Sequence, residues 1–544
     1  MLEEDSTDQE PGLEPRGERS SAARDQSAQT RQWSDSEAVI LRGIFRLGKK
    51  SHDVLLTKSC LSWTPITPET PTGEACAGPS GRLLLRDVFA VKVKRRRSVG
   101  QPSGGAVLGL ALLWARQHGP RLKEDALHLH NASSQHTQLW YTAVKQLITD
   151  MAGRPRCLKV LINPSSHRKE AVHVYREHVA PLFKMAAVQT HITVTEKEGH
   201  ALTLMKECKL DQYDGVVVVG GDGSVAELCH GLVLRTQLDT GSALDRPSRV
   251  SLPVGIVPAG STDIVPCSVH GVRDPVTAAL HIILGRVQRV DMCSFWSCGS
   301  LVRYGFTAML GFGGRSLACA EKRRWMPSAQ RCDYAVVKTL SRLRPVDCEV
   351  SFVETKTSSS SSEDCEQNST HTEEESWTTN QGLYLNISVM SIPGLSPYTP
   401  RGLAPNTRLA NGSAALITVG NTSRTQFIKH LKRLGAPSGQ LDFPFVEAHN
   451  VTAVKICPRA AIGSEEESEE EAVQSESSAL PIVQSQSGSE SVALQLQRGA
   501  LPWNIDGELV PLQQEVLIRV HPRLMCLYGQ EVDQAESSAS CGCI

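Results

Sequence analysis

The feature that most constrains this chain is a run of four valines, Val216–Val219, that leads directly into Gly220-Gly221-Asp222-Gly223-Ser224. A continuous apolar run of this length is typical of a strand buried on both faces, as in a parallel sheet. Glycines at the end of such a strand let backbone N–H groups approach phosphate oxygens, and a following helix N-terminus adds a favourable partial charge. The pattern predicts a phosphate-binding turn, although a glycine turn alone is also a common loop device.

Asp222 is the candidate catalytic residue of this turn. A carboxylate here is placed to take a proton from an attacking hydroxyl or to hold Mg²⁺ beside a transferring phosphoryl group. Glu227 should follow on the first turn of the next helix. A second turn, Pro258-Ala-Gly260-Ser261-Thr262, follows the next apolar run and offers hydroxyl donors for a second phosphate-side wall. The sequence contains no Walker A, GxGxxG or protein-kinase motif, so such a cradle would belong to another class of phosphotransferase.

Both turns fall in a region, residues 154–292, where short apolar runs alternate with helical patterns. The apolar run Leu158–Ile162 reads as a strand and Lys169–Met185 as a helical stretch. Strands that alternate with helices predict an α/β nucleotide domain with a parallel, doubly wound sheet. Ligands of such sheets bind at the carboxyl ends of the strands, where both turns lie.

Residues 293–530 have a different pattern, in which short β runs dominate. They predict a mostly antiparallel β-sandwich domain that closes over the first. Two inserts rich in Ser and Glu, near 355–380 and 462–495, and the tail 531–544 are expected to be disordered. The tail ends in a sequence that only superficially fits a prenylation box.

The N-terminal part divides into a polar arm, residues 1–36, and a region of short strand-like runs, residues 37–150. The arm is too polar to bury much surface and is expected to be disordered. The second region ends in a helical stripe formed by Trp140, Val144 and Leu147, which could plug the open end of a barrel. These features resemble a pleckstrin-homology-like β-barrel with a C-terminal helix.

A basic tract in this region comprises Lys92, Lys94, Arg95, Arg96 and Arg97. In a pleckstrin-homology-like domain, such a tract would meet anionic phosphoinositide headgroups. It also fits a nuclear localisation signal or an ordinary solvated loop. The sequence leaves these three interpretations open.

Composition bounds the location and the partners of the chain. The formal net charge of −1 excludes a strong global attraction to nucleic acid. The 16 cysteines form no CxxC pair or zinc-site spacing, so we expect a reducing compartment and no permanent metal site. No apolar run reaches the roughly 18 residues of a membrane span, so membrane contact should be peripheral. We expect a cytoplasmic protein associated with internal membranes of the endoplasmic reticulum or Golgi, with a nuclear pool as an alternative.

Five motifs occur in an order that resembles the diacylglycerol-kinase catalytic superfamily: Asn163-Pro164, Thr195-Glu196, Gly220–Gly223, Pro258–Thr262 and Asp506-Gly507-Glu508. With a pleckstrin-homology-like region ahead of them, the layout resembles the ceramide kinase branch. Three further segments resemble the ceramide kinase-like members of that branch: Leu41–Phe45, Arg401–Asn406 and Phe427–Arg433.

The resemblance implies a lipid-kinase fold that uses ATP and Mg²⁺, with the nucleotide between the α/β domain and the β-rich domain. Asp222 would be the base, or would orient the metal ion. Glu508 would close the nucleotide site from the β-rich domain. The implied nucleotide-binding residues are Asn163, Pro164, Thr195, Gly220, Gly221, Gly223, Ser224, Glu227, Gly260, Ser261, Thr262 and Glu508.

Two departures from the family pattern concern the two substrates. Family members follow Asn-Pro with a glycine-rich turn, whereas this chain continues with Ser165–Arg168, which brings Cβ atoms close to the expected phosphates. Ceramide and sphingosine kinases carry an Asp on the lipid side where this chain has Arg315, in Gly311-Phe-Gly-Gly-Arg315. A donor-only guanidinium reverses the hydrogen-bonding role of an acceptor-only carboxylate.

Two functions are therefore compatible with the sequence. The chain could keep ATP-binding motifs, lack ceramide kinase activity and act as a regulatory protein in sphingolipid-linked survival signalling. Alternatively, it could be an active ATP-dependent lipid kinase for ceramide, diacylglycerol or another, anionic lipid. The expected partners are a nucleotide and a lipid or membrane surface that the N-terminal region contacts, and no nucleic acid.

Overall fold

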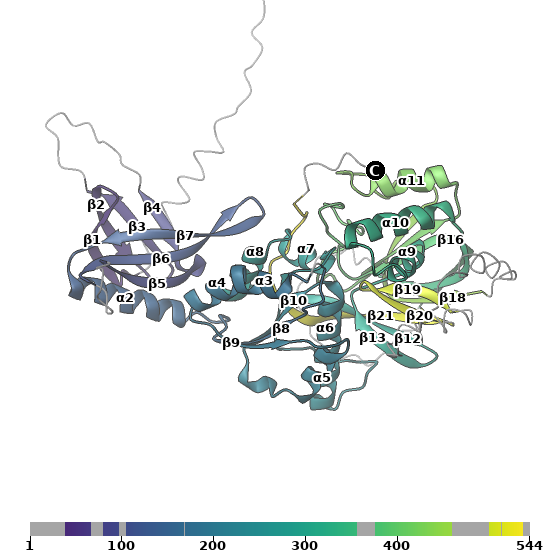
Figure 1. The fold of residues 1–544 in the computed structure, drawn as a ribbon, viewed down its shortest axis with the longest axis horizontal. Helices are drawn as coiled ribbons and strands as arrows, with labels where there is room; N and C mark the ends of the chain where they lie inside the picture. The colour runs from purple at the N-terminus through teal and green to yellow at the C-terminus, as the bar shows by residue number, and fades with distance from the viewer. Residues whose placement is uncertain are drawn as a thin grey trace, which may run out of the picture. The chain divides into compact units, whose positions relative to one another are not determined.

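The computed structural model describes residues 38–66, 80–96, 105–167, 169–355, 376–459, 500–512 and 514–536 (Figure 1). Contacts divide the chain into two compact units. The first is built from most of the N-terminal strands and α2, and the second from residue 149 onward together with residues 87–90 and 112–127. The predicted arm, Arg97, Arg168, most of both inserts and residues 537–544 lie outside the described ranges.

The N-terminal strands form one seven-stranded sheet in the order β4-β3-β2-β1-β7-β6-β5. Alternate residues of β2 are buried, as expected of strands with one face on a core. The bounds are β1 Leu41–Leu47, β2 Lys50–Leu56, β3 Cys60–Pro65, β4 Gly81–Leu84, β5 Val88–Arg95, β6 Val107–His118 and β7 Arg121–His130, with a 3₁₀ turn at Leu85–Asp87.

Helix α2, Ser134–Thr149, follows this sheet and confirms the predicted apolar stripe. Trp140 and Val144 are buried. The Trp140 ring packs edge-on against Phe45 of β1, with ring centroids 4.9 Å apart. Large aromatic surfaces buried in this way contribute strongly to a small core.

In the second unit, the predicted parallel strands form a sheet in the order β11-β10-β8-β9. The valine run lies in β10, which is buried along its whole length and pairs in parallel with β8 and β11. Helices connect these strands, as in other parallel sheets. The strands are β8 Cys157–Ile162, β9 Gln189–Val194, β10 Gly215–Gly220 and β11 Val254–Pro258. The helices are α3 Ala171–Val174, a π-helix Tyr175–Val179, α4 Ala180–Met185, α5 His200–Glu207, a 3₁₀ turn Leu210–Gln212, α6 Asp222–Thr240, α7 Ile264–His270 and α8 Pro275–Ile283.

The remaining strands are antiparallel, as predicted, and continue the same 14-stranded sheet. Strand β21 makes the junction, because it pairs in parallel with β11 and antiparallel with β12 and β18. The bounds are β12 Val287–Ser297, β13 Ser300–Gly305, β14 Thr307–Gly311, β15 Val346–Glu354, β16 Thr378–Met390, β17 Ala414–Gly420, β18 Val446–Pro458, β19 Leu501–Ile505, β20 Glu508–Leu512 and β21 Val516–Tyr528.

Three helices of the β-rich region were not predicted: α9 Phe312–Glu321, α10 Ser328–Ser341 and α11 Arg424–Arg433. They pack over the antiparallel strands through Phe312 and Phe427, whose ring centroids are 5.1 Å apart, together with Val336 and Leu340. Of the helices that the structure describes, none is long and apolar enough to cross a membrane.

Candidate nucleotide and lipid site

The two predicted glycine turns lie against each other at the carboxyl ends of β10 and β11. A Cβ placed on Gly221 would be 3.0 Å from the Gly260 Cα, and one placed on Gly260 would overlap Gly221. Real Cβ atoms do not approach backbone this closely, so the two turns meet only because both positions are glycine. Ser261 and Thr262 follow in the second turn, and both are exposed. The turns therefore present backbone and hydroxyl groups at one edge of the sheet.

Asp222 is the first residue of α6, and its carboxylate connects the two turns. Its Oδ2 accepts the backbone N–H of Ile264 at 3.1 Å, and its Oδ1 accepts that of Val265 at 2.9 Å. These N–H groups belong to the start of α7, where carboxylates are favourable. Burial, and then the nearby Asp263 carboxylate, raise the pKa of Asp222 to about 6. Asp222 thus holds α7 against the first turn, and its pKa is close to the range that suits a general base.

The second turn is held by an ion pair that the sequence analysis did not identify. Asp263 is fully buried, accepts the Gly260 N–H at 2.9 Å and pairs with Arg273 Nε at 2.6 Å. Arg273 also donates to the Gly260 carbonyl. A buried carboxylate with this many donors fixes the geometry of a turn. Asp263 follows the predicted motif directly, whereas no local signal marked Arg273.

Asn163 and Thr195 follow β8 and β9, at the same edge of the sheet. Asn163 Nδ2 donates to Ser224 Oγ at 2.8 Å, which connects it to the first glycine turn. The Thr195 N–H donates to the Ile162 carbonyl at 2.9 Å. The structure thus brings Asn163 and Ser224 together and places Thr195 on the neighbouring strand end. Pro164 begins the loop that follows Asn163.

The loop after Asn163 shows the consequence of its missing glycines. His167 and Lys169 have φ values of +46° and +64°, in the left-handed region that favours glycine. Ser166, directly before His167, is buried, and a Cβ on Gly221 would lie 3.7 Å from its Oγ. Non-glycine residues in this conformation cost roughly 1–2 kcal/mol each. The backbone of this loop therefore adopts left-handed conformations that glycine favours, although its residues are not glycine.

Glu227, predicted to contact the nucleotide, has a different set of contacts in the structure. Its Oε1 accepts the backbone N–H groups of Ala201 at 2.9 Å and Leu202 at 3.2 Å. Both belong to the first turn of α5, where unsatisfied N–H groups need a partner. In the structure, Glu227 therefore joins α6 to α5.

Glu508 lies at the start of β20 and faces the first glycine turn, as the resemblance implied. A Cβ on Gly223 would be 3.1 Å from Glu508 Oε1. Glu508 is paired with Arg303, which is nearly buried and was not predicted. Burial raises the pKa of Glu508, while Arg303 opposes this effect. The first glycine turn therefore has the β-rich region as a direct neighbour.

Asp506, in the same Asp-Gly-Glu motif, has a structural role. Its carboxylate accepts the N–H groups of Phe306 at 2.9 Å and Thr307 at 2.8 Å. It occupies a left-handed turn with Gly507, at φ values of +50° and +81°. Burial raises the pKa of Asp506 to about 6. Asp506 positions the strand end from which Glu508 projects.

Comparison with known proteins identifies both halves of this unit. Residues 157–295 match the family model described as the diacylglycerol kinase catalytic domain. Residues 306–544 match the one described as the ceramide kinase C-terminal domain. A human protein named ceramide kinase-like protein is 43% identical over 533 residues, which cover 92% of this chain and 92% of that protein. This chain belongs to the ceramide kinase family.

Two further similarities are to an enzyme and to a solved structure. Human ceramide kinase is 31% identical over 500 residues, covering 85% of this chain and 90% of that enzyme. The solved structure of a putative diacylglycerol kinase from Bacillus anthracis is 13% identical and covers 70% of this chain and 97% of its own, with a TM-score of 0.45. The latter likeness is too distant to place individual residues.

Arg315, on the lipid side expected for the ceramide kinase family, lies on the first turn of α9. Its guanidinium donates to the backbone carbonyl of Arg344, at the far end of the α9–α10 pair. Its Nε is buried and has no hydrogen-bond partner among the residues that the structure describes. Burial, and then Arg344, lower the pKa of Arg315. None of these contacts connects Arg315 to the predicted nucleotide residues.

The basic tract of the N-terminal unit lies where β5 ends. Lys92, Arg95 and Arg96 are exposed and Lys94 is half-buried, whereas Arg97 lies outside the described residues. The Arg96 N–H donates to the Ala106 carbonyl at 2.8 Å, so the described part of the tract remains attached to β6. Its role in this member of the ceramide kinase family remains a prediction.

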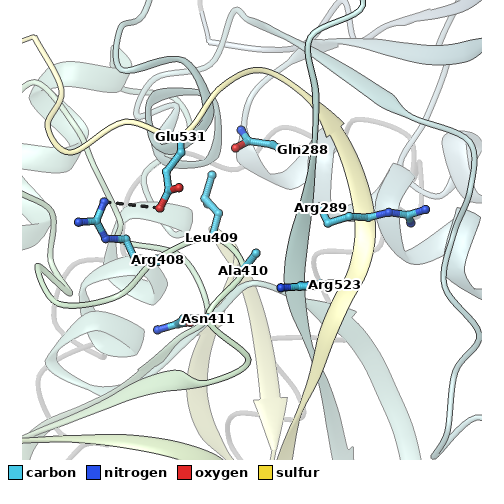
Figure 2. Close-up of a pocket in the computed structure, with 8 residues that line it drawn as sticks. All are labelled: Gln288, Arg289, Arg408, Leu409, Ala410, Asn411, Arg523 and Glu531. Atoms are coloured by element: carbon cyan, nitrogen blue, oxygen red, sulfur yellow. Dashed lines mark hydrogen bonds and ion pairs between the residues drawn. The ribbon is translucent and has the colours of Figure 1, made fainter. Parts of the chain in front are cut away.

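A cavity of about 490 Å³ in the second unit contains none of the predicted site residues. Figure 2 shows that Arg289 and Arg408 of its lining extend in opposite directions. Arg408 pairs with Glu531 at 3.5 Å and with Asp533 at 2.5 Å, and Arg289 donates to the Val250 carbonyl at 2.7 Å. Arg289 and Arg408 are therefore already engaged, and this cavity is no counterpart of the glycine turns.

Proposed function

We propose that this chain binds ATP at the paired glycine turns, does not phosphorylate ceramide, and acts as a regulatory protein in sphingolipid-linked survival signalling. The observation that carries the proposal is the contrast between the two substrate sides. The turns keep the close glycine contact that phosphate binding needs, whereas the lipid side presents the guanidinium of Arg315. Kinship with ceramide kinases suggests the signalling context.

The nucleotide part of the proposal rests on the shape of the turns. The phosphates would lie along Gly221–Ser224, at the N-terminus of the long helix α6, where N–H groups and partial positive charge favour anions. The side chains of Ser261 and Thr262 are exposed, and their hydroxyls form a long hydrogen bond of 3.5 Å with each other that a ligand could replace. Bound ATP would supply the phosphoryl group and would bring its own divalent ion, expected to be Mg²⁺.

The metal ion would depend on the nucleotide for most of its ligands. Among the described residues there is no group of three His, Cys, Asp or Glu side chains that could hold it. Both carboxylate oxygens of Asp222 already accept backbone N–H groups. Mg²⁺ usually keeps several waters and binds through one or two carboxylates plus phosphates, so Asp222 could contribute one contact.

The lipid part of the proposal rests on Arg315. A hydroxyl group that must be deprotonated or oriented needs an acceptor, and a guanidinium offers only donors. The positive charge of the Arg315 guanidinium would suit an anionic headgroup better than neutral ceramide. Phosphorylation of an anionic lipid is therefore the second candidate function.

For the N-terminal unit, we propose a pleckstrin-homology-like module that binds anionic headgroups through Lys92, Lys94, Arg95 and Arg96. Its seven-stranded sheet and the single following helix support this proposal. Such a module would hold a cytoplasmic protein at internal membranes. A nuclear pool is the alternative use of the same tract.

The test measures ATP binding and lipid phosphorylation on the full chain. Calorimetry with Mg-ATP should show binding, weakened roughly fivefold or more in the double variant Ser261→Ala, Thr262→Ala, because each lost hydrogen bond costs about 1 kcal/mol. Thr142→Ala, an exposed hydroxyl on α2, is the matched control. Radiolabelled ATP with a lipid panel should label no ceramide.

Each result has a separate meaning. Absence of any ATP binding by the wild-type chain would refute the nucleotide proposal. Labelled ceramide would refute the proposal of inactivity. Labelling of an anionic lipid alone would replace the regulatory proposal with the second candidate function.

A further inference from the structure

The helices over the β-rich region concentrate positive charge that the chain as a whole lacks. We define the basic helical layer as residues 312–344, which contain α9 and α10, and residues 424–433, which form α11. The first segment has eight Lys and Arg against two acidic residues, and the second has four against none. The whole chain has a net charge of −1, so this surface is strongly basic in a nearly neutral protein.

Most of these cations are exposed. Of the two acidic residues, Asp333 is exposed, whereas Glu321 is half-buried and paired with Arg324. Within the two segments, one exposed carboxylate stands against eight exposed cations, an excess that favours a positive surface potential. The exposed cations are Lys322, Arg324, Arg342, Arg344, Arg424, Lys429, Lys432 and Arg433.

Two large apolar side chains project from this cationic surface. Trp325, in the short connection between α9 and α10, is 80% exposed, and Val337 in the middle of α10 is 66% exposed. Trp325 has Arg324 as a direct neighbour and Lys322 one helical turn away. Trp is the side chain that prefers the boundary between headgroups and acyl chains, because its ring is apolar and its N–H is polar.

The exposure of these side chains does not reflect a poorly packed segment. Figure 1 shows α10 and α11 side by side, and Arg424 of α11 donates to the Ser341 carbonyl at the end of α10 at 2.8 Å. The inner faces of both helices share one apolar cluster that includes Phe427, Val336 and Leu340. The layer is thus a packed support that holds its outer side chains in place.

We propose that the basic helical layer is a docking surface for an anionic lipid bilayer, with Trp325 inserted at the level of the headgroups. Cations attract the anionic surface, and the apolar side chains enter the interface, which is the combination that peripheral membrane binding requires. Nucleic acid would use the cations but leave Val337 and Trp325 without an apolar partner. The inference concerns membrane binding and requires neither ATP nor phosphoryl transfer.

This surface differs from the basic tract of the N-terminal unit and lies on the half that carries Arg315. Helix α9 begins with the turn that holds Arg315 and ends at the connection that holds Trp325. A bilayer bound at Trp325 would therefore be contacted by the same helix that forms the lipid side. Docking would bring the family's lipid side to the membrane whether or not a lipid is phosphorylated there.

The experiment measures binding of the full chain to vesicles in a background that carries Arg95→Ala and Arg96→Ala, which removes two of the four described cations of the other basic tract. Vesicles of phosphatidylcholine are compared with equal mixtures of phosphatidylcholine and phosphatidylserine. We expect binding to the mixture only, and weakening about fivefold for each cation removed by Lys429→Gln and Lys432→Gln. Lys206→Gln with Lys209→Gln, two exposed lysines at α5, should bind like the background.

A second readout tests insertion. Brominated acyl chains should quench part of the tryptophan fluorescence, and Trp325→Ala should remove that quenching and weaken binding severalfold. Leu238→Ala is the control, because it removes another exposed apolar side chain, on α6, where Leu238 is 68% exposed. It should change neither the quenching nor the vesicle binding.

Three results would overturn the proposal. One is unchanged vesicle binding after Lys429→Gln and Lys432→Gln. Another is quenching that persists in Trp325→Ala. The third is tight binding to an oligonucleotide that does not depend on Trp325, which would make nucleic acid the partner. Each variant should keep the ATP binding of the wild type, so failure here is distinguishable from failure of the nucleotide proposal.

Discussion

The glycine turns and the lipid side differ in what fixes them. At the turns, Gly221 and Gly260 touch backbone to backbone, so a side chain at either position has no space. At the start of α9, the lipid side is defined by one side chain, that of Arg315. Its guanidinium donates to the backbone carbonyl of Arg344 and does not disturb the helix. A site defined by backbone packing cannot change without loss of the fold, whereas a site defined by one side chain can reverse its charge and leave the fold unchanged.

The largest expected effect tests the first half of this comparison. Gly260→Ala places a methyl group on Gly221 and Asp263, and should lower the free energy of unfolding by roughly 3 kcal/mol, as overpacking of a tight site does. Chemical denaturation measures the change. Gly382→Ala, whose new methyl group would meet only ordinary contacts, should change stability by less than about 0.5 kcal/mol. Equal losses in both variants would show that the two turns can separate without cost.

The next effect concerns pH. The pKa of Asp222 is raised to about 6 from 3.8, so the folded protein binds its proton more tightly than the unfolded chain does. Asp222 should therefore make the free energy of unfolding fall as pH rises from about 4 to about 6, by roughly 1–2 kcal/mol, with no further change above that range.

Denaturation at several pH values in wild type and Asp222→Asn isolates this contribution. In the variant, the free energy of unfolding should fall less steeply between pH 4 and pH 6. The remaining pH dependence comes in part from Asp506, whose pKa is raised to about the same value. A steeper slope in the variant would contradict the assignment. Loss of ATP binding in Asp222→Asn at neutral pH, with the fold intact, would extend the role of Asp222 to the ligand.

The lipid side gives the third prediction. Arg315→Asp restores the acceptor that ceramide and sphingosine kinases carry, and we expect ceramide phosphorylation at least tenfold above that of the wild type, which corresponds to roughly 1.4 kcal/mol of barrier. Labelled lipid is the measurement. Arg315→Gln removes the charge without supplying a carboxylate and should show no gain.

A failure of Arg315→Asp to phosphorylate ceramide would also be informative about the lipid side. If Arg315→Asp keeps ATP binding and still labels no ceramide, the lipid side differs from an active site by more than one side chain. The Ser165–Arg168 loop would then be the next difference to test, with glycines restored after Pro164.

The smallest expected effect concerns that loop. Lys169→Gly removes a side chain from a left-handed position and should raise the free energy of unfolding by about 0.5–1 kcal/mol. Lys159→Gly, in the regular strand β8, should lower it by a similar amount, because glycine there only adds disorder to the unfolded chain. A loss in both variants would show that the Lys169 side chain contributes more than its backbone conformation costs.

The sequence predicted the elements whose signal is local. The valine run became a strand buried along its whole length, and the Trp140 stripe became the inner face of α2. Both follow from periodicity within a few residues. The helices α9, α10 and α11 escaped prediction because the cluster that they pack into includes Leu385 of β16 and Val419 of β17, which are distant in sequence from α9 and α10.

Residues that act through distant partners were the hardest to predict. Arg303 pairs with Glu508 across 205 positions of sequence, and no local pattern marks it. Glu227 was predicted to contact the nucleotide because of its place after the glycine turn, and that contact stays a prediction; in the structure its Oε1 caps α5. A carboxylate near a helix start has several competing N–H partners, and only the three-dimensional arrangement decides among them.

Strand β21 has a consequence for how this protein is made. Leu527 pairs with Val254 of β11, so β11 gains this neighbour only when a strand more than two hundred residues further along the chain has been synthesised. During translation, the β11 edge lacks this neighbour until β21 has been synthesised. A messenger RNA cut short before β21 would therefore yield a chain with an open sheet edge beside its phosphate-binding turns, and such edges recruit other chains into aggregates.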